Sequence, residues 1–170
     1  MSARWLLPFT HGVDMRAIGY LVSLAENNGA TLIPVSLISV QNNAGSGGAR
    51  LEHIQQSKDF LEAVKYKAAR LQVPVERYEV FTSDVMQSIT MLVHDLHCDG
   101  IVMVTIEKKE VLLRAHELKR LLVEPPAALV LIRLPSRSQK VGALYLGASF
   151  FSRLRRLWRY RIGTRPMKNN

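Results

Sequence analysis

The chain has 170 residues, of which 48% are hydrophobic, and a single cysteine. This length and apolar content fit one globular domain and argue against a disordered chain, and one cysteine cannot form an internal disulfide. We expect a cytoplasmic protein, because no apolar stretch approaches the roughly 20 residues of a membrane span and the apolar segment before Pro8 is too short for a secretory signal.

The net charge of +9 is concentrated at the C-terminal end of the chain. Residues 136–170 contain nine lysines and arginines and no acidic residue, which leaves 14 basic and 14 acidic residues in the segment 1–135. Such an asymmetry is typical of a separate interaction segment. We therefore divide the chain into an α/β domain, residues 1–135, and a basic tail, residues 136–170.

Within residues 1–135, apolar strands alternate with helices that are apolar on one face. In chain order, the pattern predicts a strand over 5–10, a helix capped by Asp14, a strand over 31–40, a helix over 50–71, a strand over 75–82, a helix capped by Ser83 or Asp84, a strand over 101–105, a helix over 111–124 and a strand over 127–134. This order predicts a three-layer α/β domain, with an open, mostly parallel sheet and helices on both of its faces.

Residues 5–135 resemble the universal stress protein family in the order and pattern of these elements. The first strand leads into Thr10-His11-Gly12, where that family has an Asp-Gly pair, and Ile101–Thr105 resembles its fourth strand. Leu121–Leu134 resembles its last helix end, proline and closing strand. The resemblance implies five strands in the order 3-2-1-4-5. It also implies a homodimer through the last strand, where the apolar edge Leu129–Ile132 needs cover.

The ATP-binding branch of that family has a glycine-spaced loop after its fourth strand, which this chain lacks. Alignment on Thr105 and Pro126 places other residues at the glycine positions: Val104, Glu107, Glu110 and Ala115-His116. His11 stands where the family's acidic residue contacts the nucleotide. Because acidic side chains repel a triphosphate and a β-branched residue hinders close backbone approach, we predict that the usual ATP site is absent. The resemblance then implies a non-catalytic stress-response or regulatory module, and we expect no cofactor.

The alternative function is a sensor of a nucleotide or another anion. Open parallel sheets bind ligands in the crevice at the carboxyl ends of their strands, here the first and the fourth. The candidate ligand-binding residues are His11, Gly12, Thr105, Lys108, Lys109 and His116. A simpler interpretation of Glu107–Glu110 is a solvated turn whose charges compensate one another.

Metal binding and catalysis have less support. His94, His97 and Cys98 fall at i, i+3 and i+4, so a helix would place them on neighbouring turns, where they could bind zinc. A structural cysteine beside two surface histidines is the simpler interpretation, and we predict no metal. Gly45–Gly48 lacks the lysine and hydroxyl residue that follow the glycines of a phosphate loop, and no catalytic motif is present. We predict that the protein is not an enzyme.

In the tail, apolar residues recur at near-helical spacing with arginines between them. The predicted contact residues are Arg153, Arg155, Arg156, Trp158, Arg159 and Arg161. A basic amphipathic helix suits an anionic membrane surface, which would make the protein peripheral at the inner membrane. Packing of the apolar face on the domain or on a partner is the next alternative. Nucleic acid, bound through phosphate contacts and base stacking, ranks third.

Overall fold

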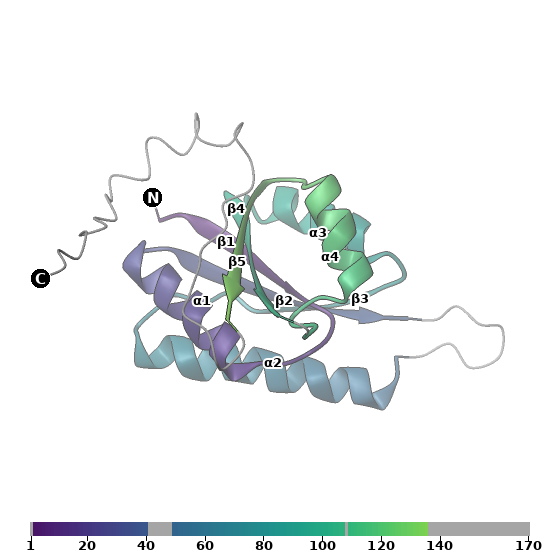
Figure 1. Ribbon diagram of the computed structural model, residues 1–170, viewed down its shortest axis with the longest axis horizontal. Coiled ribbons are helices and arrows are strands. Elements are labelled where there is room, and N and C mark those ends of the chain that lie inside the picture. Colours follow the sequence, from purple (N-terminus) through teal and green to yellow (C-terminus); the bar gives the residue numbers. More distant parts are fainter. Residues whose placement is uncertain (1, 41–48, 108, 136–170) are drawn as a thin grey trace, which may run out of the picture.

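The computed structural model describes residues 2–40, 49–107 and 109–135 (Figure 1). The elements are β1 (Arg4–Phe9), α1 (Met15–Asn27), β2 (Thr31–Ser39), α2 (Leu51–Arg70), β3 (Tyr78–Thr82), α3 (Val85–Asp95), β4 (Gly100–Ile106), α4 (Ala115–Val123) and β5 (Ala128–Leu134). The strands form one parallel sheet in the order β3-β2-β1-β4-β5. The predicted fold class and strand order are confirmed.

Helices cover both faces of the sheet. Figure 1 shows α1 and α2 on one side, and α3 and α4 on the other. Because β2 lies inside the sheet and is covered on both faces, all its residues from 31 to 38 are buried, without the alternation of a half-exposed strand. On one side of the sheet, the rings of Phe9 and Phe60 stack with their centroids 4.2 Å apart and so join β1 to α2.

The predicted helix caps are present at both aspartates. The Asp14 carboxylate accepts hydrogen bonds from the backbone N–H groups of Arg16 and Ala17, at 2.9 and 3.1 Å, and Asp84 caps α3 in the same way. Each carboxylate satisfies amide groups that have no partner within the helix. These caps fix where α1 and α3 begin, and hence where the loops that follow β1 and β3 end.

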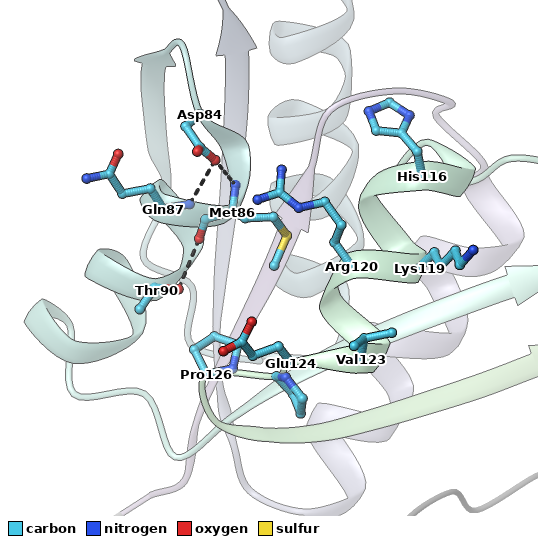
Figure 2. Close-up of a pocket in the computed structure, with 11 residues that line it drawn as sticks. Asp84, Met86, Gln87, Thr90, His116, Lys119, Arg120, Val123, Glu124 and Pro126 are labelled. Atoms are coloured by element: carbon cyan, nitrogen blue, oxygen red, sulfur yellow. Dashed lines mark hydrogen bonds between the residues drawn. The ribbon is translucent and has the colours of Figure 1, made fainter.

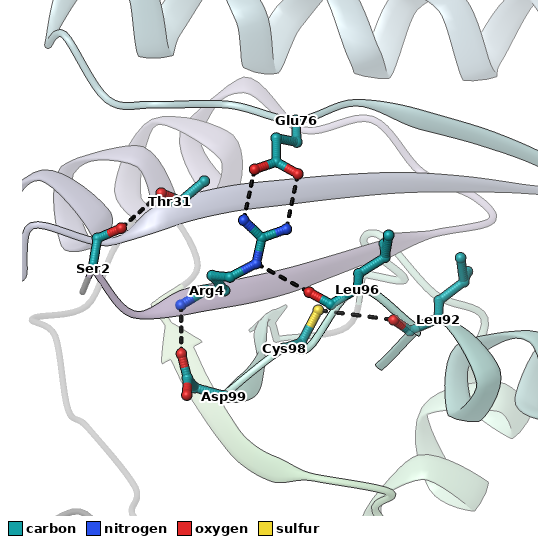
Figure 3. A network of polar contacts seen from close by, with 8 residues as sticks. All are labelled: Ser2, Arg4, Thr31, Glu76, Leu92, Leu96, Cys98 and Asp99. Carbon is teal, nitrogen blue, oxygen red and sulfur yellow. Dashed lines mark hydrogen bonds and ion pairs between the residues drawn. The ribbon is translucent and has the colours of Figure 1, made fainter. Parts of the chain in front are cut away.

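A polar network joins the amino ends of the strands (Figure 3). The Arg4 guanidinium donates to both carboxylate oxygens of Glu76, at 2.6 and 2.8 Å, and to the carbonyl oxygen of Leu96 at 3.0 Å. The hydrogen bonds from Arg4 hold the pKa of the Glu76 carboxyl below its usual range. Half-buried Cys98 lies in the same network, and burial raises the pKa of its thiol to about 11. The thiol therefore stays protonated near neutral pH, which suits a structural role.

Two predicted boundaries were wrong. The third strand begins at Tyr78, and Val75 makes only an isolated bridge with Leu32. The fourth helix begins at Ala115 instead of residue 111, because Leu112 has a φ of +69°, which no right-handed helix allows. The apolar residues that completed the helical pattern belong to a buried loop.

The zinc alternative for His94, His97 and Cys98 lacks the helix that it requires. Helix α3 ends at Asp95, and His97 has a φ of +50°, so the three side chains do not lie on successive helical turns. Within residues 2–40, 49–107 and 109–135, no group of three His, Cys, Asp or Glu side chains could hold a metal ion.

Several sequence predictions lie outside the described residues. They concern the Gly45–Gly48 loop, Lys108 and the tail with its contact residues Arg153, Arg155, Arg156, Trp158, Arg159 and Arg161.

None of the helices in the described part of the chain combines the length and the hydropathy that are needed to cross a membrane.

Candidate functional site

At the carboxyl ends of β1 and β4, the loop after β4 is hydrogen-bonded to the segment after β1. Three residues of the loop between β4 and α4, Val111, Leu112 and Leu113, are buried, and Leu112 is fully buried. The Leu112 carbonyl oxygen accepts hydrogen bonds from the backbone N–H groups of Thr10, at 2.7 Å, and His11, at 3.2 Å. The Leu112 N–H in turn donates to the Gly12 carbonyl oxygen at 3.2 Å. The loop after β4 is thus paired to the segment after β1.

Gly12 makes this pairing possible. Its φ is +76°, and a Cβ at this position would lie 2.6 Å from the carbonyl oxygen of Glu110. Only glycine satisfies both the conformation and the close approach. The predicted ligand residue Gly12 therefore contacts the protein's own loop in this structure.

A buried glutamate completes the site. The Glu117 side chain is 5% exposed and lies in the first turn of α4. Its carboxylate accepts hydrogen bonds from the Thr10 hydroxyl and from the backbone N–H of Arg114, the latter at 2.8 Å. Sequence reasoning missed this residue. The available signal was its place three residues after the helix start, where a glutamate commonly turns back to cap the helix.

Lys109 is neutralised within the site. Its ammonium group lies 2.7 Å from the Asp14 carboxylate, which also caps α1. Burial raises the pKa of Asp14, but the hydrogen bonds from Lys109 and from the amides of Ala17 and Arg16 outweigh it, so the pKa is lowered overall. The pair is therefore charged near neutral pH, and Lys109 already has an anionic partner.

The remaining candidates lie apart from this pairing. Half-buried Thr105 has its hydroxyl 3.5 Å from the carbonyl oxygen of Ile132 on β5. Exposed His116 lines a groove of about 890 Å³ between α3 and α4 (Figure 2). Carboxylates and cations both line that groove, among them Asp84, Glu124, Lys119 and Arg120. The structure thus brings His11, Gly12 and Lys109 together, and places His116 in another cleft.

Replacement of Gly12 tests the loop pairing. We expect Gly12→Ala to lower the free energy of unfolding by about 2–5 kcal/mol, since a positive φ costs a non-glycine residue about 1–2 kcal/mol and overpacking adds about 1–3 kcal/mol. Gly29→Ala is the matched control, because Gly29 has a φ of +57° but no atom within 4 Å of the added Cβ. Urea unfolding of both variants measures the difference. Equal losses would contradict a role for the contact with Glu110.

Comparison with known proteins agrees with this fold. The family model described as "Universal stress protein family" matches residues 9–128. No curated protein matches the chain significantly. The structure is similar to that of a universal stress protein family member from Burkholderia pseudomallei, with a TM-score of 0.58 and 17% identity over 75% of this chain and 93% of that one.

Two other similar structures contain nucleotides. One is a universal stress protein in complex with cAMP, with a TM-score of 0.53 and 13% identity over 78% of this chain and 98% of that chain. The other is the universal stress protein of Archaeoglobus fulgidus in complex with dAMP, with a TM-score of 0.53 and 10% identity over 77% and 97% of the respective chains. At these identities the likeness shows a shared fold. Together with the match over most of the domain, it establishes that the chain belongs to the universal stress protein family.

Proposed function

We propose that the domain is a non-catalytic stress-response or regulatory module that does not bind ATP in the crevice between β1 and β4. The observation that carries the proposal is the pairing of the loop after β4 with the segment after β1, in which buried Leu112 is hydrogen-bonded through its backbone to Thr10, His11 and Gly12. Phosphate binding in such folds requires free backbone N–H groups. Here the amides of Thr10 and His11 already donate to Leu112.

The charges beside the crevice also support this proposal. The first amides of α1 donate to the Asp14 carboxylate, so the helix N-terminus that would attract a phosphate is capped by an anion. Glu117 brings a second, buried carboxylate to the end of β1. Lys109 already pairs with Asp14, so its charge is partly compensated before any phosphate arrives. Each of these two carboxylates would repel a triphosphate that lay beside it.

The competing function is a nucleotide or anion sensor at the same crevice. Two similar proteins were solved with cAMP and dAMP, and they share the fold with this chain. In this chain, a nucleotide that bound the backbone N–H groups at the end of β1 would have to break their hydrogen bonds with Leu112. The affinity for nucleotide therefore decides between the two functions.

Calorimetric titration of ATP, with and without magnesium, tests the proposal. We expect no saturable binding in the micromolar range to residues 1–135, because the amides of Thr10 and His11 already donate to Leu112. The shortened chain excludes nonspecific binding of phosphate to the basic tail, and circular dichroism checks that it is folded. Micromolar binding that is weakened by Lys109→Ala would overturn the proposal and establish a sensor.

We also propose that the chain forms a homodimer through β5, as members of this family commonly form homodimers. β5 is a terminal strand of the sheet and pairs only with β4 among the described residues. Leu129, Val130 and Leu131 on this strand are half-buried. An apolar strand at a sheet edge needs cover, and a second copy of the strand supplies it.

Charge on β5 should disrupt this dimer. We expect the wild-type chain to sediment as a dimer and the Leu129→Lys, Leu131→Lys double variant as a monomer, because two ammonium groups cannot be buried at the interface without partners. Met91→Lys is the control, since Met91 is an exposed apolar residue on α3. A monomeric wild-type chain in sedimentation velocity would contradict the proposal.

For residues 136–170, we propose attachment of the domain to an anionic membrane surface. The support is the composition of the segment, with nine cations and no acidic residue, and aromatic residues among the arginines. Each basic residue near such a surface contributes about 1 kcal/mol, so several together suffice for binding. Attachment to a partner protein or to nucleic acid is the alternative.

Liposome sedimentation tests this attachment. We expect the full chain to sediment with vesicles containing phosphatidylserine and to be released by high salt, because the attraction is electrostatic. Residues 1–135, which are formally neutral, should stay in the supernatant. Equal behaviour of the two chains would exclude the membrane role and direct attention to protein or nucleic-acid partners.

A further inference from the structure

A second groove lies on the helical face formed by α1 and α2, which run side by side in Figure 1. Its volume is about 650 Å³, within the range of small-molecule sites. The residues that line it come from α1 and from the end of α2. None of the candidate residues in the crevice between β1 and β4 lines this groove, so the two sites are separate.

The groove is lined by three cations, Arg16, Lys67 and Arg70, and by no carboxylate. Some other cations of the described chain have acidic partners, since Lys65 and Arg77 pair with Glu62 and Lys109 pairs with Asp14, whereas others, such as Lys58 and Lys119, form no ion pair among the described residues. Within the described residues, no such ion pair is made by the three cations of the groove. Like charges that share a groove repel one another, and a bound anion would remove that repulsion.

Gly19 leaves space for this cluster. It lies in the interior of α1, where glycine weakens a helix relative to alanine. Its φ is not positive, and an added Cβ would make only an ordinary contact, 3.5 Å from the Lys67 ammonium nitrogen. The backbone therefore does not require glycine at this position. The missing side chain keeps the groove open beside the Lys67 ammonium group.

The rest of the lining is suited to an organic group. The Tyr20 ring, 39% exposed, and the apolar side chains of Met15 and Leu71 line the groove, together with the Ser23 hydroxyl. Lysine and arginine bind phosphate through charge-assisted hydrogen bonds, and an aromatic ring offers a flat apolar surface. The nine cations of residues 136–170 would be repelled by this groove, so the chain's own tail is a poor occupant.

We propose that the groove between α1 and α2 binds a small organic phosphate. Lys67 and Arg70 hold the phosphate, and Tyr20 with Met15 contacts the organic part. The Arg16 guanidinium, which donates to the Pro135 carbonyl oxygen at 3.2 Å, adds positive charge at the edge of the groove. The phosphate belongs either to a free small molecule or to the headgroup of an acidic phospholipid. The recognition chemistry is the same for both sources.

The first test uses phenyl phosphate and amide chemical shifts of the full-length, isotope-labelled chain. We expect saturable shifts at the amides of Gly19 and Ser23, which report on the groove and not on the basic tail. The double variant Lys67→Gln, Arg70→Gln should weaken this binding about tenfold or more, because hydrogen bonds to charged groups are among the stronger ones. The control Lys58→Gln, Lys65→Gln removes the same charge from α2 outside the groove and should bind normally.

Gly19→Leu provides a test that leaves the charge unchanged. The larger side chain fills the groove, and its Cβ meets only the end of a flexible lysine, so we expect a folded protein that has lost binding. Dispersed amide spectra establish folding for each variant. The proposal would be overturned if phenyl phosphate left the amide shifts of Gly19 and Ser23 unchanged. Equal loss of phenyl phosphate affinity in the groove and control double variants would also overturn it.

Vesicles distinguish the two sources of phosphate. We compare the binding of the full chain to phosphatidic acid vesicles and to phosphatidylcholine vesicles. If the wild type and the control variant prefer phosphatidic acid and the groove double variant does not, the ligand is a lipid headgroup. If the groove double variant loses phenyl phosphate binding but both double variants bind vesicles equally, the ligand is a free small-molecule phosphate. If the groove and control variants match in both assays, the groove is not a phosphate site.

Discussion

The backbone pairing between Leu112 and the segment that follows β1 determines the conformation of the loops at the carboxyl ends of β1 and β4. Three hydrogen bonds join Leu112 to Thr10, His11 and Gly12. They place the β4–α4 loop over the crevice, bury its apolar side chains and set the start of α4 at Ala115. The same loop brings Lys109 to Asp14, which caps α1. The functional interpretation of the crevice therefore depends on the conformation of one residue.

The sheet could be predicted well from the sequence, because buried apolar strands that alternate with one-sided helices favour a parallel sheet covered on both faces. Long apolar strands separated by one-sided helices require cover on both faces, and the caps at Asp14 and Asp84 are recognisable without a structure. The polar network around Arg4 was not predictable in this way. It joins Arg4 to Glu76 and to the carbonyl of Leu96, which are 72 and 92 residues away along the chain, and no local pattern connects them.

The candidate site was predicted less well, and the reason is local. Val111, Leu112 and Leu113 extend the apolar pattern of α4 backwards, so periodicity assigned them to the helix. Their burial follows from contact with the β1–α1 segment, which periodicity cannot represent. The groove between α1 and α2 was missed for a similar reason. Arg16 and Lys67 lie on different helices, and only the packing of α1 against α2 brings both residues to the lining of one groove.

The glycine after β1 shows why a family motif is weak evidence for a ligand. A glycine in this position of a parallel sheet is usually explained by close approach of a phosphate to the backbone. Here Gly12 approaches the Glu110 carbonyl, and its positive φ turns the chain toward α1. Both requirements arise from the protein's own chain and involve no ligand. A glycine can therefore remain at this position after the glycines of the β4–α4 loop are replaced, because the loop that fills the crevice requires the same close approach.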